Sequence, residues 1–185
     1  MFEKVLKNLL SVALIAGIFL ACSSEKQDED NNISSVKEQM DEENLSFSLK
    51  MFDGGSMAVK KEAGHLSFDN ANKATLFVFF TTWCMPCLGE IPHLNKIQEK
   101  YKENFNIIGV LLEDKDKEGL ENFTLKHKIN YQIANGEENY LFARVLGGVS
   151  GVPMMFLYGK GGTLIKQYLG LVPSEMLEID IAKVL

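Results

Sequence analysis

The chain has 185 residues, of which 46% are hydrophobic, with 25 acidic and 19 basic side chains and a net charge of −6 at pH 7. Residues 25–44 hold eight acidic and two basic side chains, so this short stretch accounts for the whole net negative charge, and the rest of the chain is close to neutral. A chain with this charge gives no reason to expect nucleic acid or an acidic membrane surface as a partner.

The first residues have the pattern of an export signal. Two lysines precede an apolar run over residues 9–21, which is too short to cross a bilayer but suits the core of a signal peptide. A small residue stands directly before Cys22, as in the lipobox of bacterial lipoproteins, although Phe19 replaces the usual leucine. We therefore predict a lipoprotein signal peptide over residues 1–21 and a lipid on Cys22, which places the chain on the extracytoplasmic, periplasmic side of a bacterial membrane. An uncleaved anchor or ordinary signal cleavage would also export it.

A tether and one domain are predicted after the signal. From residue 22 to residue 44 the chain is rich in Asp, Glu, Asn, Ser and Gln and has almost no aromatic or aliphatic side chains. Such a segment buries too little apolar surface to offset chain entropy, so we interpret it as a flexible, acidic tether. Residues 45–185 remain, which is the size of one ordinary domain with room for a core.

This domain is predicted to contain both strands and helices. The apolar run over residues 76–80 indicates a buried parallel strand. A helix should follow from Cys84 to Tyr101, because apolar residues recur there every three or four positions, and Pro92 should kink it. The other predicted elements are a hairpin of strands 45–51 and 56–59, a strand over 107–112, a helix through Leu120, Phe123 and Leu125, an extended piece over 129–134, a short helix over 140–146, an antiparallel hairpin of 154–158 and 164–169, and a final helix capped by Ser174 that runs to Leu185.

Cys84 and Cys87 lie where the long helix begins, separated by Met85 and Pro86. Two thiols at this spacing can close as a small disulfide ring. Unpaired N–H groups and the helix dipole at the N-terminus favour the thiolate of Cys84, which makes it the candidate nucleophile. A structural disulfide or half of a zinc site is the alternative. A tetrahedral zinc site needs two further ligands, and the sequence offers neither a second such pair nor paired histidines, so no metal is expected.

Several motifs together resemble the thioredoxin superfamily. They are Trp83-Cys84-Met85-Pro86-Cys87, the later Gly151-Val152-Pro153, and Glu90 with Pro92 after the second cysteine. Glu90 and Pro92 are similar to the exported TlpA-like and ResA-like branch, which includes thioredoxins that serve cytochrome c maturation. The resemblance covers residues 45–185. It implies an α/β thioredoxin fold, βαβ followed by ββα, with a central mixed sheet flanked by helices and an N-terminal β-hairpin.

Three residues of the long helix receive catalytic roles. Cys84 would attack a substrate disulfide, and Cys87, deeper in the fold, would resolve the mixed disulfide that forms. Glu90 is on the same helix face as Cys87, where a partly desolvated carboxylate would have a raised pKa and could take the proton of Cys87. This role is also what the resemblance implies. A solvated surface glutamate is the alternative.

A substrate-binding surface is expected around the disulfide. By resemblance, the Val152–Pro153 bond would be cis and face the cysteines, so that Val152 could offer its N–H and C=O to an extended substrate segment. An ordinary trans proline at the start of a strand is the alternative. Trp83, Met85 and Pro86 would line the same surface, although a tryptophan beside an apolar strand is also typical of a core.

These features predict a membrane-anchored thiol:disulfide oxidoreductase whose redox group is the Cys84–Cys87 pair, with no other cofactor. We favour a monomeric reductant of exported cysteine-containing proteins, apocytochrome c among them, recharged by a membrane thiol electron carrier. One alternative is a disulfide oxidase of the same fold, because Gly151-Val152-Pro153 also resembles the loop of periplasmic oxidases. Those oxidases contain an inserted helical domain, for which the interval between Cys87 and Pro153 is too short. The other alternative is a Cu(I) chaperone with two thiolate ligands, which would usually need a third ligand.

Overall fold

The computed structural model describes residues 44–69 and 72–185. The predicted signal peptide, Cys22 and the tether up to residue 43 lie outside these residues. No helix in the described part of the chain is both long and apolar enough to cross a membrane. In chain order the elements are β1 (Asn44–Lys50), β2 (Ser56–Glu62), β3 (His65–Phe68), β4 (Ala74–Phe80), α2 (Met85–Tyr101), β5 (Phe105–Leu111), α3 (Lys117–His127), β6 (Gln132–Ala134), α4 (Glu138–Val145), β7 (Met154–Tyr158), β8 (Leu164–Leu169) and α5 (Ser174–Ala182).

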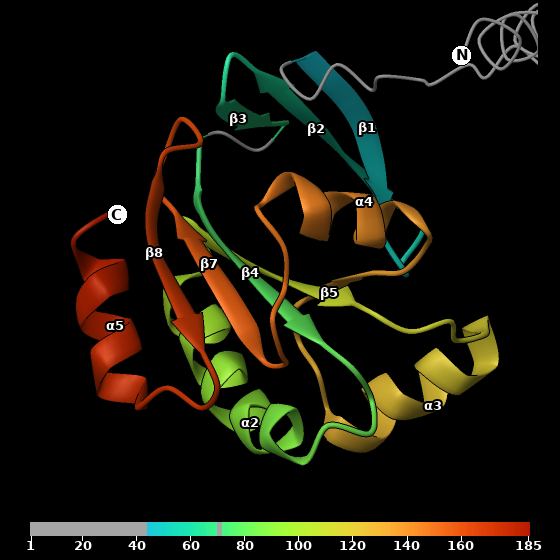
Figure 1. The fold of residues 1–185 in the computed structure, drawn as a ribbon. Coiled ribbons are helices and arrows are strands. Elements are labelled where there is room, and N and C mark those ends of the chain that lie inside the picture. Colours follow the sequence, from blue (N-terminus) through green and yellow to red (C-terminus); the bar gives the residue numbers. More distant parts are fainter. Residues whose placement is uncertain (1–43, 70–71) are drawn as a thin grey trace, which may run out of the picture. The chain divides into compact units, whose positions relative to one another are not determined.

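The centre of the fold is a five-stranded mixed sheet in the order β6-β5-β4-β7-β8 (Figure 1). Strands β4, β5 and β6 are parallel, whereas β7 is antiparallel to β4 and β8 is antiparallel to β7. The unit β4–α2–β5 is the predicted βαβ, and β7–β8–α5 is the predicted ββα. The expected α/β thioredoxin fold is therefore confirmed.

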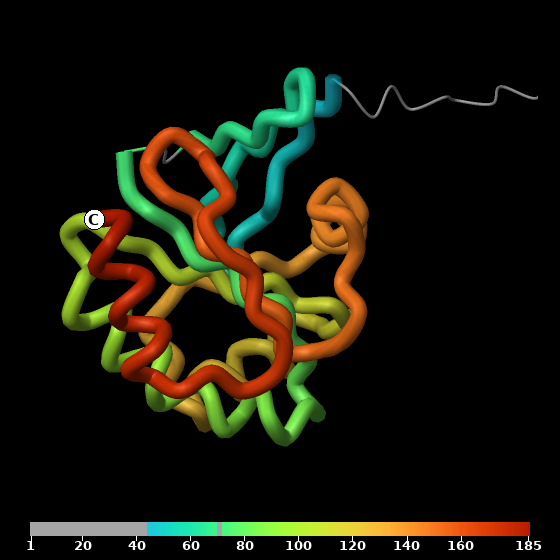
Figure 2. The backbone as a smooth tube through the Cα atoms, turned by 60° about the vertical axis from the view of Figure 1, so that its left-hand side comes forward, coloured from blue at the N-terminus to red at the C-terminus, as the bar shows by residue number. Residues whose placement is uncertain are grey.

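Strand β4 is buried along its whole length because both of its faces are covered. Leu76 and Val78 point to one face, where they pack with residues of α2 and α5. Phe77 and Phe79 alternate with them and point to the other face, where α4 and the N-terminal strands lie. Figures 1 and 2 show these two layers, with α2 and α5 together on one side of the sheet and α4 on the other.

The N-terminal part forms a three-stranded antiparallel sheet, β1-β2-β3, rather than the predicted two-stranded hairpin. The sequence analysis missed β3, which is only four residues long and has one buried side chain. That side chain is Phe68, whose ring lies 5.0 Å from the ring of Phe77 and 5.2 Å from that of Tyr158, measured between centroids. Strand β3 thus depends on a contact with the central sheet that its own short sequence does not reveal.

The last helix begins differently from the prediction. Ser174 is the first residue of α5, and the cap position is Pro173, with no side-chain hydrogen bond. The backbone N–H groups of Met176 and Leu177 donate instead to the carbonyl oxygen of Pro173, at 3.0 and 3.2 Å. The prediction that Ser174 caps the helix was therefore wrong, and α5 ends at Ala182 rather than at Leu185.

One edge of β5 is closed by a side chain. Strand β6 pairs with residues 108–110 of β5, so on that side the beginning of β5 has no neighbouring strand, although β4 pairs with it on the other side. There the amide of Gln98, from α2, donates to the carbonyl of Phe105 at 3.2 Å and accepts from the N–H of Ile107 at 2.6 Å. A single glutamine thus satisfies the two backbone groups that a further strand would have paired.

A polar network joins α5 to β8. Asp180 is buried and accepts hydrogen bonds from Lys166 at 2.7 Å, Tyr168 at 2.9 Å and Lys183 at 3.0 Å. These three donors, Lys166 first, hold the pKa of the Asp180 carboxyl well below its ordinary value of 3.8. The ionised carboxylate therefore stabilises the contact between the helix and the edge strand.

The turn between β7 and β8 contacts the N-terminal sheet. Gly161 and Gly162 both have φ of +82°, a conformation that other residues rarely adopt. A Cβ at Gly162 would lie 2.0 Å from the carbonyl oxygen of Leu66 in β3, whereas a Cβ at Gly161 would meet nothing within 4 Å. The turn can therefore pack against β3 only while residue 162 has no side chain.

We expect the Asp180 network to make the free energy of unfolding decrease at acidic pH. A carboxyl whose pKa is depressed in the folded state stabilises the fold above its unfolded pKa, and this stabilisation is lost as the pH falls through the native pKa. Asp180→Asn should therefore destabilise the protein at pH 7 and lose less stability than the wild type between pH 5 and pH 2. Urea unfolding at a series of pH values measures this, and parallel curves for the two proteins would contradict it.

The two turn glycines offer a matched pair of substitutions. Gly161→Ala should lower the free energy of unfolding by about 1–2 kcal/mol, because a residue with a side chain is strained in the left-handed conformation. Gly162→Ala has the same backbone penalty and also collides with Leu66, so its loss should exceed that of Gly161→Ala by about 1–3 kcal/mol. Denaturant unfolding of both variants tests the difference. Equal losses of unfolding free energy in the two variants would show that the contact of the turn with β3 does not contribute to stability.

Candidate functional site

The two cysteines lie at the N-terminus of α2 and form a disulfide, with their Cα atoms 5.2 Å apart. Cys84 is the N-cap residue, and its sulfur accepts a hydrogen bond from the backbone N–H of Cys87 at 3.2 Å. Pro86 lies in the first turn, where a missing N–H costs nothing. The sulfur of Cys84 therefore lies at the positive end of the helix dipole, which favours its thiolate once the pair is reduced.

The burial of the two cysteines differs from the prediction. Cys87 was expected to be deeper than Cys84, yet the exposed fractions are 4% and 5%. Cys84 is covered because the proline loop lies against it, with the carbonyl oxygen of Val152 3.5 Å from its sulfur. In this oxidised form the two residues are equally shielded from solvent.

The proline loop has the predicted geometry. The Val152–Pro153 peptide bond is cis, which confirms the expectation, and Pro153 is buried. The carbonyl oxygen of Pro153 accepts a hydrogen bond from the backbone N–H of Gly170 at 2.8 Å. The loop between β8 and α5 is thereby fixed beside the proline loop, at the same end of the sheet as the cysteines.

Exposed apolar side chains surround the disulfide. Trp83 and Met85 are 72% and 73% exposed, so the structure places Trp83 on the surface and not in the core. Sequence analysis did not assign two further residues, Leu169 and Leu171, which are also exposed and flank Gly170. Leu171 lies close to Gly89 of α2, and Leu169 lies close to Gly151 of the proline loop. Two leucines on either side of a turn glycine, at the end of a predicted strand, are the sequence signal that could have indicated them.

Glu90 is buried behind the disulfide, one helical turn beyond Cys87. Its residue surface is 1% exposed, and neither carboxylate oxygen has a hydrogen-bond partner among the described residues. Burial raises the pKa of this carboxyl above its ordinary value of 4.5, and the nearby N–H of Val172 and the charge of His93 only partly oppose this. The alternative of a solvated surface glutamate is therefore wrong, and the position is suited to accept a proton.

Tyr131 is the other ionisable residue affected by Glu90. Burial, followed by the negative charge of Glu90, raises the pKa of the Tyr131 phenol. Tyr131 directly precedes β6, so a residue from the sheet side of the molecule lies near Glu90. Both groups are neutral when Glu90 is protonated, which is the state that burial favours.

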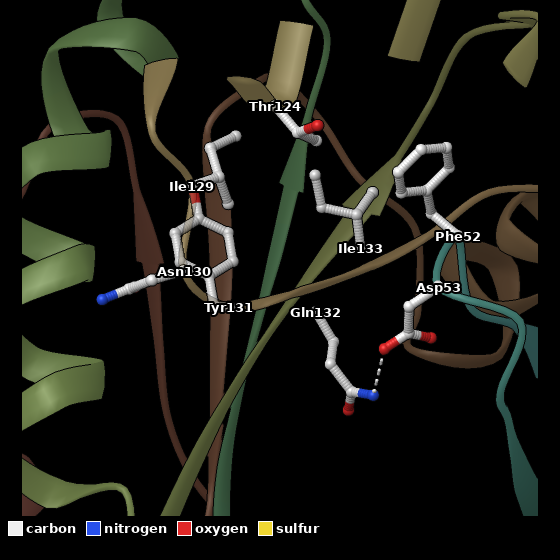
Figure 3. Close-up of a pocket in the computed structure, with 8 residues that line it drawn as sticks. All are labelled: Phe52, Asp53, Thr124, Ile129, Asn130, Tyr131, Gln132 and Ile133. Atoms are coloured by element: carbon white, nitrogen blue, oxygen red, sulfur yellow. Dashed lines mark hydrogen bonds between the residues drawn. The ribbon is translucent and has the colours of Figure 1, made fainter. Parts of the chain in front are cut away.

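A separate cavity of about 340 Å³ lies beside β6 (Figure 3). Its polar margin includes Asp53 and Gln132, whose side chains are joined by a hydrogen bond of 3.1 Å. None of the predicted site residues lines it. The lining consists of Phe52, Asp53, Thr124, Ile129, Asn130, Tyr131, Gln132 and Ile133.

Within the described residues, no group of three or more His, Cys, Asp or Glu side chains is arranged to hold a metal ion. The groups at the site that can undergo redox chemistry are the two sulfurs. A nucleophilic sulfur, a resolving sulfur, a buried carboxyl and an apolar surface together suit exchange between this disulfide and one in another protein.

Comparisons with known proteins agree with this geometry. A family model described as "AhpC/TSA family" matches residues 41–167. The chain is 29% identical over 116 residues to the thiol-disulfide oxidoreductase ResA of Bacillus thuringiensis, which is 63% of this chain and 66% of ResA. The match thus spans just under two thirds of that relative.

Solved structures show the same fold. A candidate thiol:disulfide interchange protein, DsbE of Chlorobium tepidum, superimposes with a TM-score of 0.62 at 25% identity, covering 76% of this chain and 93% of that protein. StoA of Bacillus subtilis superimposes with a TM-score of 0.57 at 20% identity, covering 74% of this chain and 96% of StoA. At that identity the likeness to StoA concerns the fold alone.

We predict that Glu90→Gln raises the stability of the protein and slows catalysis. A buried carboxyl with a raised pKa costs stability as the pH rises from its unfolded pKa toward its folded pKa. The glutamine variant lacks this cost, so it should gain stability relative to the wild type as the pH rises above the ordinary carboxyl pKa of 4.5. Without a proton acceptor for Cys87, resolution of a mixed disulfide should slow by on the order of 10²-fold.

Urea unfolding and single-turnover exchange measure the two effects of Glu90→Gln. Glu99→Gln, which changes an exposed glutamate of the same helix, is the matched control and should not alter the rate of resolution. Unchanged resolution in the Glu90 variant would remove Glu90 from the mechanism.

Proposed function

Because the chain belongs to the AhpC/TSA family of thioredoxin-like proteins, we propose that it is a thiol:disulfide oxidoreductase that works through Cys84 and Cys87. The observation that carries the proposal is the disulfide at the N-cap of α2, beside the proline loop and above a buried carboxyl. The likeness to a thiol-disulfide oxidoreductase, ResA, supports the same activity.

The reaction begins with the reduced pair. The Cys84 thiolate attacks one sulfur of a substrate disulfide, whose S–S bond breaks and whose other sulfur leaves as a thiolate and takes a proton. A mixed disulfide now joins Cys84 to the substrate. Glu90, in its ionised form, then takes the proton of Cys87, whose sulfur attacks that of Cys84 and releases the second substrate sulfur as a thiolate. The proton passes from Glu90 to this thiolate, and the first substrate thiolate takes its proton from water. The substrate gains two electrons and two protons, and the Cys84–Cys87 pair becomes the disulfide seen here.

The surface around the cysteines supports a protein substrate. Trp83, Met85 and Pro86 are exposed on the helix side, and Val152 lies on the loop side of the disulfide. An extended segment that contains the substrate cysteine would lie between them and pair with the backbone of Val152. Apolar contacts of this kind hold the two sulfurs in line for attack.

The direction of transfer is the second part of the proposal. We favour a reductant, because the segment between α2 and β7 contains only β5, α3, β6 and α4, with no inserted helical domain of the kind predicted for the oxidase alternative. The Cu(I) alternative has less support, since the described residues bring no third His, Cys, Asp or Glu ligand to the pair.

Location and partners complete the proposal. The pattern of residues 1–22 supports export and a lipid on Cys22, with residues 23–43 as a tether to an extracytoplasmic membrane surface. Substrates would be exported proteins with cysteine pairs, including the haem-attachment pair of apocytochrome c. A membrane thiol carrier would restore the reduced form, because each cycle consumes two electrons.

The full-length chain should reduce insulin disulfides with dithiothreitol as the electron source. Cys84→Ser should lose this activity, because no nucleophile remains. Cys87→Ser should form a mixed disulfide but complete no cycle. Turnover by either variant at the wild-type rate would overturn the mechanism. A midpoint potential near about −120 mV, the range of a strong oxidant, would reverse the proposed direction.

The same Cys87→Ser variant can identify the substrate in cells. Because resolution is blocked, the substrate stays bound to Cys84 through a disulfide that dithiothreitol releases. Proteins trapped by Cys87→Ser and absent from a Cys84→Ser control are the candidates, and a captured apocytochrome c would support the maturation role.

A further inference from the structure

The nucleophile is carried by a tight turn between β4 and α2. The backbone N–H of Cys84 donates to the carbonyl oxygen of Thr81 at 3.3 Å, so residues 81–84 form one β-turn. Thr82 and Trp83 are its two central residues. Any movement of this turn would displace both the sulfur of Cys84 and the exposed ring of Trp83.

A carboxylate from another strand holds this turn. Oε1 of Glu113, which follows β5, accepts hydrogen bonds from the hydroxyl of Thr82 and, at 3.4 Å, from its backbone N–H. The ammonium group of Lys115 lies 3.6 Å from the same oxygen. The Glu113 side chain is only 16% exposed, so these contacts are well shielded. Two hydrogen bonds from Thr82 and the charge of Lys115 thus converge on one oxygen atom.

Few ionisable side chains lie on the segments next to Cys84 in the described part of the chain. On α2 the ionisable neighbours are Cys87 and Glu90, and the first turn carries no acidic residue. The proline loop and the segment from residue 169 to residue 172 carry no ionisable side chain. After β5 come Glu113, Asp114 and Lys115, of which only Glu113 bonds to the turn.

We infer that Glu113 is a positioning residue of the exchange reaction, which holds the turn that presents Cys84 and opposes ionisation of the Cys84 thiol. The inference rests on the proposed function. A negative charge beside a helix N-terminus offsets part of the stabilisation that the dipole gives to a thiolate. Glu113 would therefore keep Cys84 less acidic than its N-cap position alone would make it.

Two substitutions at residue 113 separate the two effects. Glu113→Gln removes the charge but keeps an oxygen that can accept from Thr82, whereas Glu113→Ala removes both. With the charge gone, the pH midpoint for alkylation of reduced Cys84 should fall in both variants, and alkylation at pH 6 should be about twofold faster. Only Glu113→Ala should slow insulin reduction, by about tenfold, because only it frees the turn.

Two controls keep the test decisive. Asp114→Asn makes the same charge change at an exposed neighbour that does not bond to the turn, and it should shift the alkylation midpoint less than Glu113→Gln. Thr82→Val removes the hydroxyl donor and leaves Glu113 charged, so it should slow exchange without lowering the midpoint. It also tests the positioning role should Glu113→Ala not fold.

The outcomes are distinguishable from failure of the proposed function. If the wild type does not reduce insulin, the function is wrong, whatever the variants do. If the wild type is active, equal midpoints for the wild type and Glu113→Gln would overturn the charge effect. Equal exchange rates for the wild type, Glu113→Ala and Thr82→Val would overturn the positioning role.

Discussion

The pairing of β7 with β4 determines where the chemistry can occur. Strand β4 is buried along its length, and its partner β7 runs antiparallel to it with Met154 opposite Phe79. The residues before Met154 are Val152 and Pro153, and the residues after β4 lead into the turn that carries Cys84. The register therefore brings the proline loop to the disulfide, although about 70 residues separate them in the sequence. A shift of this register would separate the two halves of the site.

Much of this arrangement could be predicted from the sequence, because the central elements have strong local patterns. The apolar run of β4, the hairpin of β7 and β8 and the cysteine spacing each carry their own signal. Strand β3 was missed because it depends on a contact between Phe68 and the central sheet. The predicted cap of α5 was wrong because the helix begins with bonds to the backbone carbonyl of Pro173, which a short motif does not reveal. Glu113 is the clearest case, because its bonds to Thr82 cross 31 residues of sequence and no spacing rule connects them.

Glu90 shows why composition alone is a poor guide to a site. It is one of two glutamates on α2, and its spacing from Cys87 indicates only the helix face on which it lies. Its burial depends on the packing of α2 against the sheet and on the loop that carries Val172. Among the described residues its carboxylate oxygens have no hydrogen-bond partner, so its burial has a cost in stability that a purely structural position would not require. This burial and the location next to Cys87 are the observations that support its proposed role as a proton acceptor.

The side-chain amide of Gln98 has a consequence for behaviour at high concentration. Extended segments of other molecules attach to a sheet by bonding to free backbone groups along its margin, and such growth leads to aggregates. At the start of β5 those groups are occupied from within the same chain. The glutamine thus makes this part of the sheet margin unavailable for strand addition by another molecule.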